Sequence, residues 1–245
     1  MDSRERFSDR VGNYVRCRPA YPHDAIACLF DEVGFGPGSR VADVGSGTGI
    51  FTRQIAPLVG RVYAVEPNGR MRAAAVQAQE NIRNIVNVAA QAESTTLPDA
   101  SVDFVTAAQS FHWFDRAQCR EEFARILVPH GKVVLIWNLR RFGEGYENIM
   151  RTYSAEYDKV REHVSSGDNY SDFFSGDCIR RNFENSQKVD REGFFGRVLS
   201  SSYTPLEKDP AHKPFMDAIG RYFDENSSEG KLVLRYETEL IYGEI

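Results

Sequence analysis

The stretch Val41-Ala42-Asp43-Val44-Gly45-Ser46-Gly47-Thr48-Gly49 most constrains what this chain can fold into. Residues 41–44 predict a short buried strand, and three glycines follow at every second position before a helix-like apolar pattern begins. Glycines without Cβ atoms let a ligand approach the backbone, and the N-terminus of the next helix offers N–H groups to bind it. The stretch therefore predicts a ligand site at the end of the first strand of an α/β sheet.

Strand and helix patterns alternate along the first part of the chain, up to Asn138. Nearly continuous apolar strands that alternate with helices favour a parallel sheet covered on both faces, because each crossover helix packs on one face. The predicted strands are 40–44, 61–65, 85–90, 101–107 and 132–137, and the predicted helices are 24–33, 48–59, 69–80 and 116–127. Asn68 or a neighbour is expected to cap the helix that begins at Gly69.

The pattern changes after Asn138. Residues 139–190 are polar and aromatic without a clear strand pattern, so we expect helices and loops that cover the open end of the sheet. Residues 194–204 and 232–242 predict two strands, and residues 213–223 between them predict a helix. The two late strands would form a hairpin-like pair on the edge of the sheet.

The composition limits the partners and the compartment of the chain. Its 245 residues fit one large domain, and a formal net charge of −5 without a basic run disfavours nucleic acid as a partner. No apolar run approaches the roughly 18 residues of a membrane span, and the charged N-terminal residues lack the apolar segment of a secretory signal. The four cysteines form neither a CxxC pair nor a zinc-ligand pattern. We therefore expect a cytoplasmic protein with reduced thiols and no metal, and a monomer by default.

The spacing of the glycines indicates which ligand the turn binds. A dinucleotide fingerprint would place its third glycine at position 50, which is Ile50 in this chain, and no phosphate-binding P-loop motif is present. Glu66 ends the second predicted strand, beside the turn, where its carboxylate can accept hydrogen bonds from both hydroxyls of a ribose. The turn therefore favours a nucleoside over a dinucleotide.

Three segments, VADVGSGTG, VYAVEP and AESTTLPDASVDFV, resemble those of class I S-adenosylmethionine-dependent methyltransferases. Residues 14–22, 110–115 and 137–138 are similar to segments of the trans-aconitate-methyltransferase-like and type 11 small-molecule methyltransferases. The resemblance implies a Rossmann-like, mostly parallel sheet of seven strands with helices on both faces, an antiparallel last strand and a helical lid after strand five. It also implies one methyltransferase domain over residues 1–245, made of an N-terminal cap arm and helix (1–38), a cofactor-binding core (39–138), a lid or substrate insertion (139–192) and C-terminal strands (193–245).

The resemblance implies S-adenosyl-L-methionine as the cofactor and places its parts on this sequence. Asp43 and the glycine turn would hold the methionine part, Glu66 the ribose hydroxyls, and Gln109 would lie near the sulfonium. The family often has Asp or Ser before the Ala-Glu pair that borders the adenine, whereas this chain has Gln91. The residues expected to bind the cofactor are Tyr14, Tyr21, Asp43, Gly45, Ser46, Gly47, Thr48, Gly49, Glu66, Pro67, Asn68, Ala92, Glu93 and Gln109.

The acceptor side is predicted from residue chemistry around the expected position of the methyl group. His112 could deprotonate a hydroxyl, amine or carbon acceptor, or only bind a carboxylate. Arg140 and Arg141 follow the fifth strand, where a substrate carboxylate could be paired, and Arg18 is a second candidate. Trp113 and Phe114 would supply aromatic walls, which also suit a sulfonium cation.

The sequence thus predicts an enzyme that transfers a methyl group from S-adenosylmethionine to a small-molecule acceptor, such as a carboxylic acid or another metabolite. Such a transfer is an in-line displacement, which needs an aligned acceptor and a site without water. Two alternatives stay open: an S-adenosylmethionine-binding regulatory protein without transferase activity, and a dinucleotide oxidoreductase. The missing glycine at position 50 counts against the second alternative.

Overall fold

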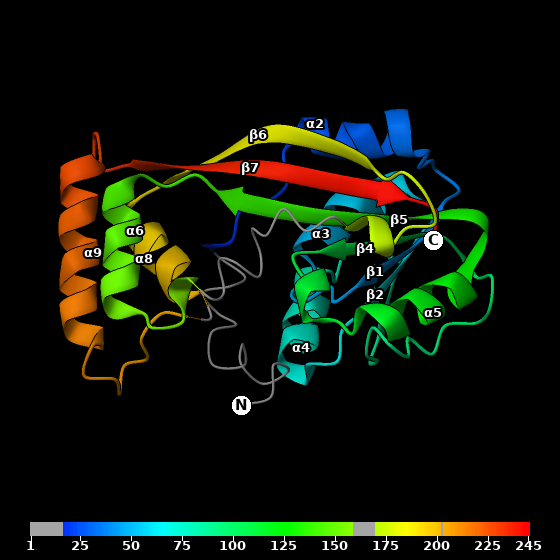
Figure 1. The fold of residues 1–245 in the computed structure, drawn as a ribbon, viewed down its shortest axis with the longest axis horizontal. Helices are drawn as coiled ribbons and strands as arrows, with labels where there is room; N and C mark the ends of the chain where they lie inside the picture. The colour runs from blue at the N-terminus through cyan, green and yellow to red at the C-terminus, as the bar shows by residue number, and fades with distance from the viewer. Residues whose placement is uncertain (1–16, 159–169, 202) are drawn as a thin grey trace.

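A computed structural model describes residues 17–158, 170–201 and 203–245, which form one mixed sheet with helices around it (Figure 1). The strand order is β3-β2-β1-β4-β5-β7-β6. The strands are β1 (Arg40–Val44), β2 (Arg61–Val65), β3 (Ile85–Val88), β4 (Val102–Ala108), β5 (Leu127–Arg140), β6 (Ile179–Val189) and β7 (Leu232–Gly243). The α-helices are α2 (His23–Cys28), α3 (Ile50–Ile55), α4 (Gly69–Ala78), α5 (Arg116–Ile126), α6 (Glu144–Tyr153), α8 (Arg191–Leu199) and α9 (His212–Asn226). Short helical turns are η2 (Leu29–Val33), η3 (Ala56–Leu58), η4 (Phe111–Trp113) and η5 (Tyr170–Asp172).

The first five strands are parallel, as predicted, and β1 and β2 have the predicted bounds. Val41, Ala42 and Val44 of β1 are fully buried, because separate apolar clusters cover the two faces of the sheet. The predicted cap of α4 is also confirmed, since the Asn68 side chain accepts hydrogen bonds from the backbone N–H groups of Arg70 and Met71. In this half of the chain, the local sequence patterns and the fold therefore favour the same elements. The patterns were sufficient to predict its strands.

The chain reverses its direction across the sheet between β1 and β4. It moves outward from β1 to β2 and β3, then returns to place β4 on the other side of β1. Ligands of open α/β sheets bind at such a switch point, beyond the carboxyl ends of the strands. The glycine turn follows β1 and Gln109 follows β4, so both lie at this point of the fold.

At this end of the sheet the pairing is antiparallel, because β7 runs opposite to both of its neighbours, β5 and β6. The antiparallel strand at 232–242 is confirmed, but its outer partner is β6 and not the predicted strand at 194–204. The sequence of β6, IRRNFENSQKV, is mostly polar because this edge strand is largely exposed, so it lacks the apolar pattern that identifies a buried strand. The expectation of helices and loops alone over residues 139–190 is therefore wrong.

Residues 194–204 were predicted as a strand, but residues 194–199 belong to helix α8, and the other described residues of this segment follow the helix without forming a strand. The Asp190 side chain accepts a hydrogen bond from the Gly193 N–H and so caps α8 at its start. Phe194 and Val198, four residues apart on one helix face, are both buried. The N-cap and this spacing are the helix signals in the segment.

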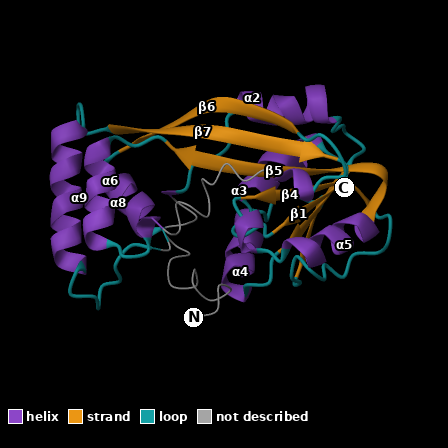
Figure 2. Ribbon diagram, viewed as in Figure 1, coloured by secondary structure: helices purple, strands orange, loops and turns teal. Residues whose placement is uncertain are grey.

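Helices α6, α8 and α9 pack together around a third apolar cluster, which we call the helical end of the molecule. Figure 2 shows the helical end beyond the long strands β5 and β7, away from α5. The cluster joins Phe194, Phe215 and Phe223 to Leu234 and Tyr236 of β7. No helix in the described ranges is both long enough and apolar enough to cross a membrane.

Candidate functional site

A cavity of about 350 Å³ extends from the glycine turn to the helical end. Its lining combines backbone of the turn, the segment after β4, the end of β5 and side chains next to α8. Of the residues predicted for the site, it brings together Arg18, Tyr21, Gly45, Ser46, Gly47, Thr48, Gln109, His112, Trp113, Arg140 and Arg141. Asp43, Gly49, Glu66, Pro67, Asn68, Ala92, Glu93 and Phe114 do not line it, and Tyr14 lies outside the described residues.

The glycine turn is held by the end of β2, because the N–H groups of Gly45 and Ser46 donate to the Val65 carbonyl at 2.8 and 3.1 Å. The turn requires left-handed backbone at Gly45, Gly47 and Gly49, whose φ angles are +67°, +57° and +73°. A Cβ on Gly47 would meet no atom of the described residues within 4 Å, so this part of the backbone faces the cavity. The turn therefore offers the close backbone approach that a bound ligand needs.

Thr48, the residue before Gly49, supports the same conclusion. Its hydroxyl is buried and finds no hydrogen-bond partner among the described residues, although Thr48 lines the cavity. Buried polar groups are normally satisfied, so this hydroxyl could hydrogen-bond a polar ligand in the cavity. These residues fit the methionine end of S-adenosylmethionine.

Glu66 is buried beside the turn with 8% of its surface exposed. One carboxylate oxygen accepts from the Gly47 N–H at 2.9 Å, and the other accepts from the Asn68 N–H at 2.8 Å. Burial raises the pKa of Glu66, although the two backbone N–H groups oppose the rise. The carboxylate therefore holds the turn and the end of β2 together, and its remaining lone pairs can accept hydrogen bonds from ribose hydroxyls.

Asp43 lies at the end of β1 under the turn and is fully buried. Its two oxygens accept hydrogen bonds from the hydroxyls of Thr52 in α3 and Thr106 in β4. Burial raises the pKa of Asp43 to about 6, although both hydroxyls favour the charged form. The structure thus gives Asp43 a supporting position, where it ties three elements around the turn, and direct contact with an ammonium group stays a prediction.

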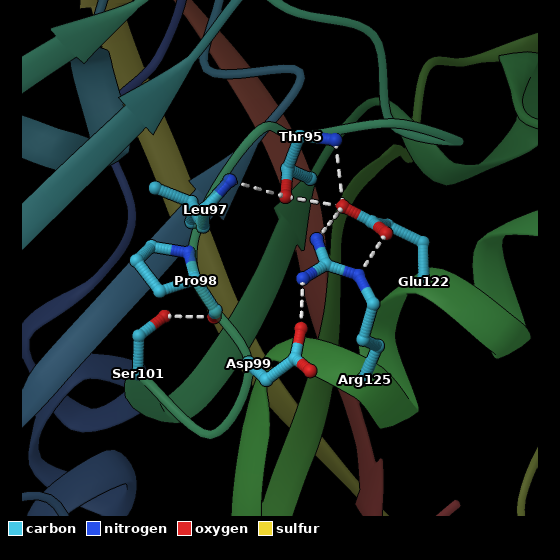
Figure 3. A network of polar contacts seen from close by, with 7 residues as sticks. All are labelled: Thr95, Leu97, Pro98, Asp99, Ser101, Glu122 and Arg125. Carbon is cyan, nitrogen blue, oxygen red and sulfur yellow. Dashed lines mark hydrogen bonds and ion pairs between the residues drawn. The ribbon is translucent and has the colours of Figure 1, made fainter.

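The loop that follows Ala92 and Glu93 in the sequence is hydrogen-bonded to α5 through Thr95 and Asp99 (Figure 3). The backbone N–H and the hydroxyl of Thr95 both donate to Glu122, at 2.7 and 2.5 Å. Arg125 bridges Glu122 to Asp99, which belongs to the same loop. Although burial alone would raise it, the pKa of Glu122 is held below its ordinary value by Arg125 and Thr95. The network fixes the loop that borders the predicted adenine position.

The segment after β4 presents three predicted residues to the cavity. Gln109 adopts a left-handed conformation with φ of +60°, and its N–H donates to the Ile136 carbonyl at 2.8 Å. His112 and Trp113 follow in η4 with their ring centroids 4.9 Å apart. Phe114 is no part of the cavity wall, because it packs edge-on against buried Phe111, 5.9 Å between centroids.

The two adjacent arginines at the end of β5 have different partners. The Arg140 guanidinium donates to the hydroxyls of Tyr203 and Ser201, the second at 2.8 Å. The Arg141 guanidinium forms an ion pair with Glu237 of β7, and 63% of the Arg141 side chain is exposed. Arg18 donates to the side chain and the carbonyl of Ser200 at 3.1 and 2.9 Å.

Several cavity residues from the helical end were not predicted, namely Tyr157, Arg197, Ser201 and Tyr203. Arg197 is the most consequential, because it is 3% exposed and its Nε donates to the Tyr236 hydroxyl at 3.1 Å. Arg197, Ser201 and Tyr203 lie in the segment 194–204 that was predicted as a strand, whereas the Asp190 cap would have indicated a helix there. No group of three His, Cys, Asp or Glu residues in the described ranges is arranged to hold a metal.

Several known proteins that are similar to this chain are described as methyltransferases. Residues 42–135 match the family model described as a methyltransferase domain. An uncharacterized methyltransferase of Mycobacterium tuberculosis is 36% identical over 164 residues, which cover 65% of this chain and 63% of that relative. An uncharacterized methyltransferase-like protein of Schizosaccharomyces pombe is 35% identical over 135 residues, 55% of this chain and 52% of the relative. The chain thus spans less than two thirds of the length of these relatives.

Solved structures show the same fold. One described as a type II methyltransferase from Anaeromyxobacter dehalogenans has a TM-score of 0.67 at 22% identity, and the match covers 93% of this chain and 97% of that one. Phosphoethanolamine N-methyltransferase 2 of Haemonchus contortus, solved with S-adenosyl-L-methionine, has a TM-score of 0.52 at 14% identity over 100% of this chain and 60% of that one. Residues 42–135 thus match a methyltransferase domain, and the chain has the same Rossmann-like fold as these solved methyltransferases.

Proposed function

We propose that the protein transfers a methyl group from S-adenosyl-L-methionine to a small-molecule acceptor bound in the cavity. The observation that carries the proposal is the glycine turn, whose backbone at Gly47 opens onto the cavity while buried Glu66 holds it in place. The domain match and the methyltransferase relatives support it. On the sequence grounds given above, the proposal includes a cytoplasmic monomer related to the trans-aconitate-like, type 11 small-molecule enzymes.

The cofactor would lie along the carboxyl ends of β1, β2 and β4. Glu66 would accept hydrogen bonds from the ribose hydroxyls, and the fixed loop with Ala92 and Glu93 would border the adenine, with Pro67 and Asn68 on its other flank. The turn from Gly45 to Gly49 would hold the methionine part, with Gln109 and Tyr21 near the sulfonium and Tyr14 closing the site. When bound, S-adenosylmethionine supplies an electrophilic methyl group.

The cavity residues would position the acceptor and keep water away. Tyr21 is fixed for this role, because its backbone N–H and carbonyl exchange two hydrogen bonds of 2.9 Å with the Gln54 side chain. Its ring packs edge-on against Phe51 at 5.3 Å. His112 lines the same cavity and would take the proton from a hydroxyl, amine or carbon acceptor, which it can hold at a ring nitrogen. Alignment within an enclosed site supplies much of the rate enhancement of such a displacement.

Calorimetric titration with S-adenosylmethionine and S-adenosylhomocysteine tests the cofactor assignment directly. We expect both to bind, and we expect Glu66→Ala to weaken binding roughly 100-fold, because charge-assisted hydrogen bonds to a buried carboxylate are lost. Glu121→Ala, which removes an exposed carboxylate from α5, is the matched control and should change nothing. Thermal unfolding checks that Glu66→Ala folds, and Glu66→Gln retains an acceptor oxygen if it does not. Equal affinities for wild type and the folded Glu66 variants would refute the role of Glu66.

A second experiment separates the proposal from the two alternatives. The protein is incubated with methyl-labelled S-adenosylmethionine and a small-molecule cell extract, and products are sought by a mass increase of one methyl group. Tight cofactor binding without any labelled product would favour a regulatory protein. Binding of a nicotinamide dinucleotide in place of S-adenosylmethionine would favour an oxidoreductase.

A further inference from the structure

Two arginines, Arg140 at the end of β5 and Arg197 on α8, line the same cavity as the glycine turn, and in the part of the chain that the structure describes their hydrogen bonds reach only neutral groups. Arg140 donates to the hydroxyls of Tyr203 and Ser201. Arg197 donates to the hydroxyls of Tyr236, Ser200 and Ser201, at 3.1, 3.3 and 3.5 Å. Ser201 Oγ thus accepts a hydrogen bond from both guanidiniums, so two positively charged side chains share one neutral acceptor.

Such a pair is costly without an anion. Arg197 is buried and Arg140 is half-buried. Charges that are removed from water in proteins are normally paired or neutralised, because the removal carries a large desolvation cost. Among the described residues, no carboxylate forms an ion pair with Arg140 or Arg197, in contrast to Arg141 with Glu237. Among the described residues that line the cavity, the one carboxylate is that of Glu147, which pairs with Arg151 at 3.2 Å. The described wall therefore has an excess of positive charge, although the whole chain carries −5.

The surroundings of the two arginines also favour an anion. The Arg140 guanidinium lies over the rings of Phe142 and Tyr203, at 5.7 and 5.6 Å from their centroids, and Arg197 lies over Tyr236 at 5.8 Å. These rings exclude water and so strengthen the field of the guanidiniums. Burial alone would raise the pKa of Tyr203, but the neighbouring positive charges of Arg140 and Arg197 lower it. The site therefore stabilises negative charge on a group placed between the arginines.

A guanidinium has five N–H donors, and two of those on Arg140 are used by Tyr203 and Ser201. Three remain, and Nη2 of Arg197 makes none of the hydrogen bonds found for that residue. Planar guanidiniums bind carboxylate and phosphate oxygens in a forked geometry, which a single lysine cannot reproduce. The hydroxyls of Ser201 and Tyr203 can rotate to donate to the same anion.

We propose that Arg140 and Arg197 form an oxyanion subsite, which binds a carboxylate or phosphate group of the acceptor at the end of the cavity away from the glycine turn. The inference rests on the proposed function, because it assigns the substrate class to that same cavity. It makes the acceptor an anionic small molecule, which would share one cavity with the cofactor.

Binding of four simple anions by the full chain tests the subsite. Succinate, citrate, inorganic phosphate and glycerol 3-phosphate are titrated at constant ionic strength in the presence of S-adenosylhomocysteine, with succinamide and glycerol as uncharged counterparts. We expect at least one anion to bind and its uncharged counterpart not to bind. Arg140→Gln and Arg197→Gln should each weaken that binding about 10-fold or more, because each removes charge-assisted hydrogen bonds.

Arg180→Gln is the matched control, because Arg180 is an arginine of the same sheet that pairs with Glu239 on the neighbouring strand. Anion affinity should stay at the wild-type value in this variant. Binding of S-adenosylhomocysteine with wild-type affinity shows that the Arg140 and Arg197 variants are folded. Arg140→Lys, which retains the charge and loses the fork, replaces Arg140→Gln if the latter does not fold, and it should still weaken anion binding.

The outcomes separate the two anion sources and the two proposals. Binding of succinate or citrate alone identifies a carboxylate acceptor, and binding of the phosphates alone identifies a phosphorylated one. Absence of binding by all four anions, or equal anion affinity in wild type and the Arg140 and Arg197 variants, overturns the subsite. If S-adenosylhomocysteine does not bind while an anion binds through Arg140, the proposed function fails and the subsite stands.

Discussion

The two ends of the cavity are built in different ways. At the glycine turn, backbone groups and short side chains from one stretch of sequence form the surface, and Gly47 leaves the backbone open to a ligand. At the helical end, long side chains converge from separate elements, with Arg140 on β5, Arg197 on α8 and Tyr203 after α8. The first end suits a ligand part that never varies, and the second can change its ligand through single side chains. This difference explains why the sequence predicted a specific ligand for the first end and left the ligand of the second end open.

At the glycine-turn end of the cavity, the largest effect is expected from Gly45→Ala. A Cβ on Gly45 would lie 2.5 Å from Ser110 Cβ, and Ser110 is itself held by a 2.8 Å hydrogen bond from its hydroxyl to the Val44 carbonyl. Left-handed backbone adds about 1–2 kcal/mol for a residue with a Cβ, and overpacking adds about 1–3 kcal/mol. We expect urea denaturation to show a loss of about 2–5 kcal/mol, and calorimetry to show loss of S-adenosylhomocysteine binding.

Gly47→Ala and Gly38→Ala are the comparison variants. Gly47 also has a positive φ, of +57°, but a Cβ there meets no atom within 4 Å, so only the backbone cost of about 1–2 kcal/mol applies. Gly38 has neither a positive φ nor a neighbour within 4 Å, and its variant should be almost neutral in stability. Equal losses of unfolding free energy for Gly45→Ala and Gly47→Ala would contradict the packing of Gly45 against Ser110.

The same contrast shows how far sequence patterns reach. The Asn68 cap depends on neighbours within a few residues, and the strand of Arg40–Val44 and the glycine turn have local apolar and glycine patterns that predict their structure. Strand β6 forms because it pairs with the edge of β7, and the polar sequence of β6 has no apolar pattern from which this pairing could be predicted. Arg197 faces the cavity only because α8 packs against β7, a long-range fact that local periodicity cannot contain.

An effect of intermediate size on the free energy of unfolding is expected from Asp43, which lies under the glycine turn. Its pKa is raised from 3.8 to about 6 in the folded protein, mainly by burial. The folded state therefore retains a proton between these pH values that the unfolded state has lost, so stability must fall as pH rises from about 4 to about 6. At about 1.4 kcal/mol per pH unit the fall is roughly 3 kcal/mol, and Asp43→Asn should abolish it.

Urea denaturation of wild type and Asp43→Asn across this pH range gives the measurement, as the difference between their free energies of unfolding. Asp103→Asn is the control, because hydrogen bonds and charge from Arg40 outweigh the effect of burial and lower the pKa of Asp103. Its contribution is lost only as pH falls below its ordinary value, so its difference from wild type should stay flat between about pH 4 and 6. A difference for Asp43→Asn that is also flat would mean that Asp43 titrates normally in the folded protein.

The smallest effect is expected from Arg141→Gln, which tests whether Arg141 acts differently from its neighbour Arg140. Arg140 donates only to hydroxyls inside the cavity, whereas Arg141 is exposed and already paired with Glu237. An exposed ion pair contributes about 0–1 kcal/mol, so Arg141→Gln should barely change stability. Its affinity for the anion that binds the wild type should change about 2-fold at most, because Glu237 already neutralises this guanidinium. A loss as large as that of Arg140→Gln would move the subsite toward the surface and would place both arginines on the acceptor.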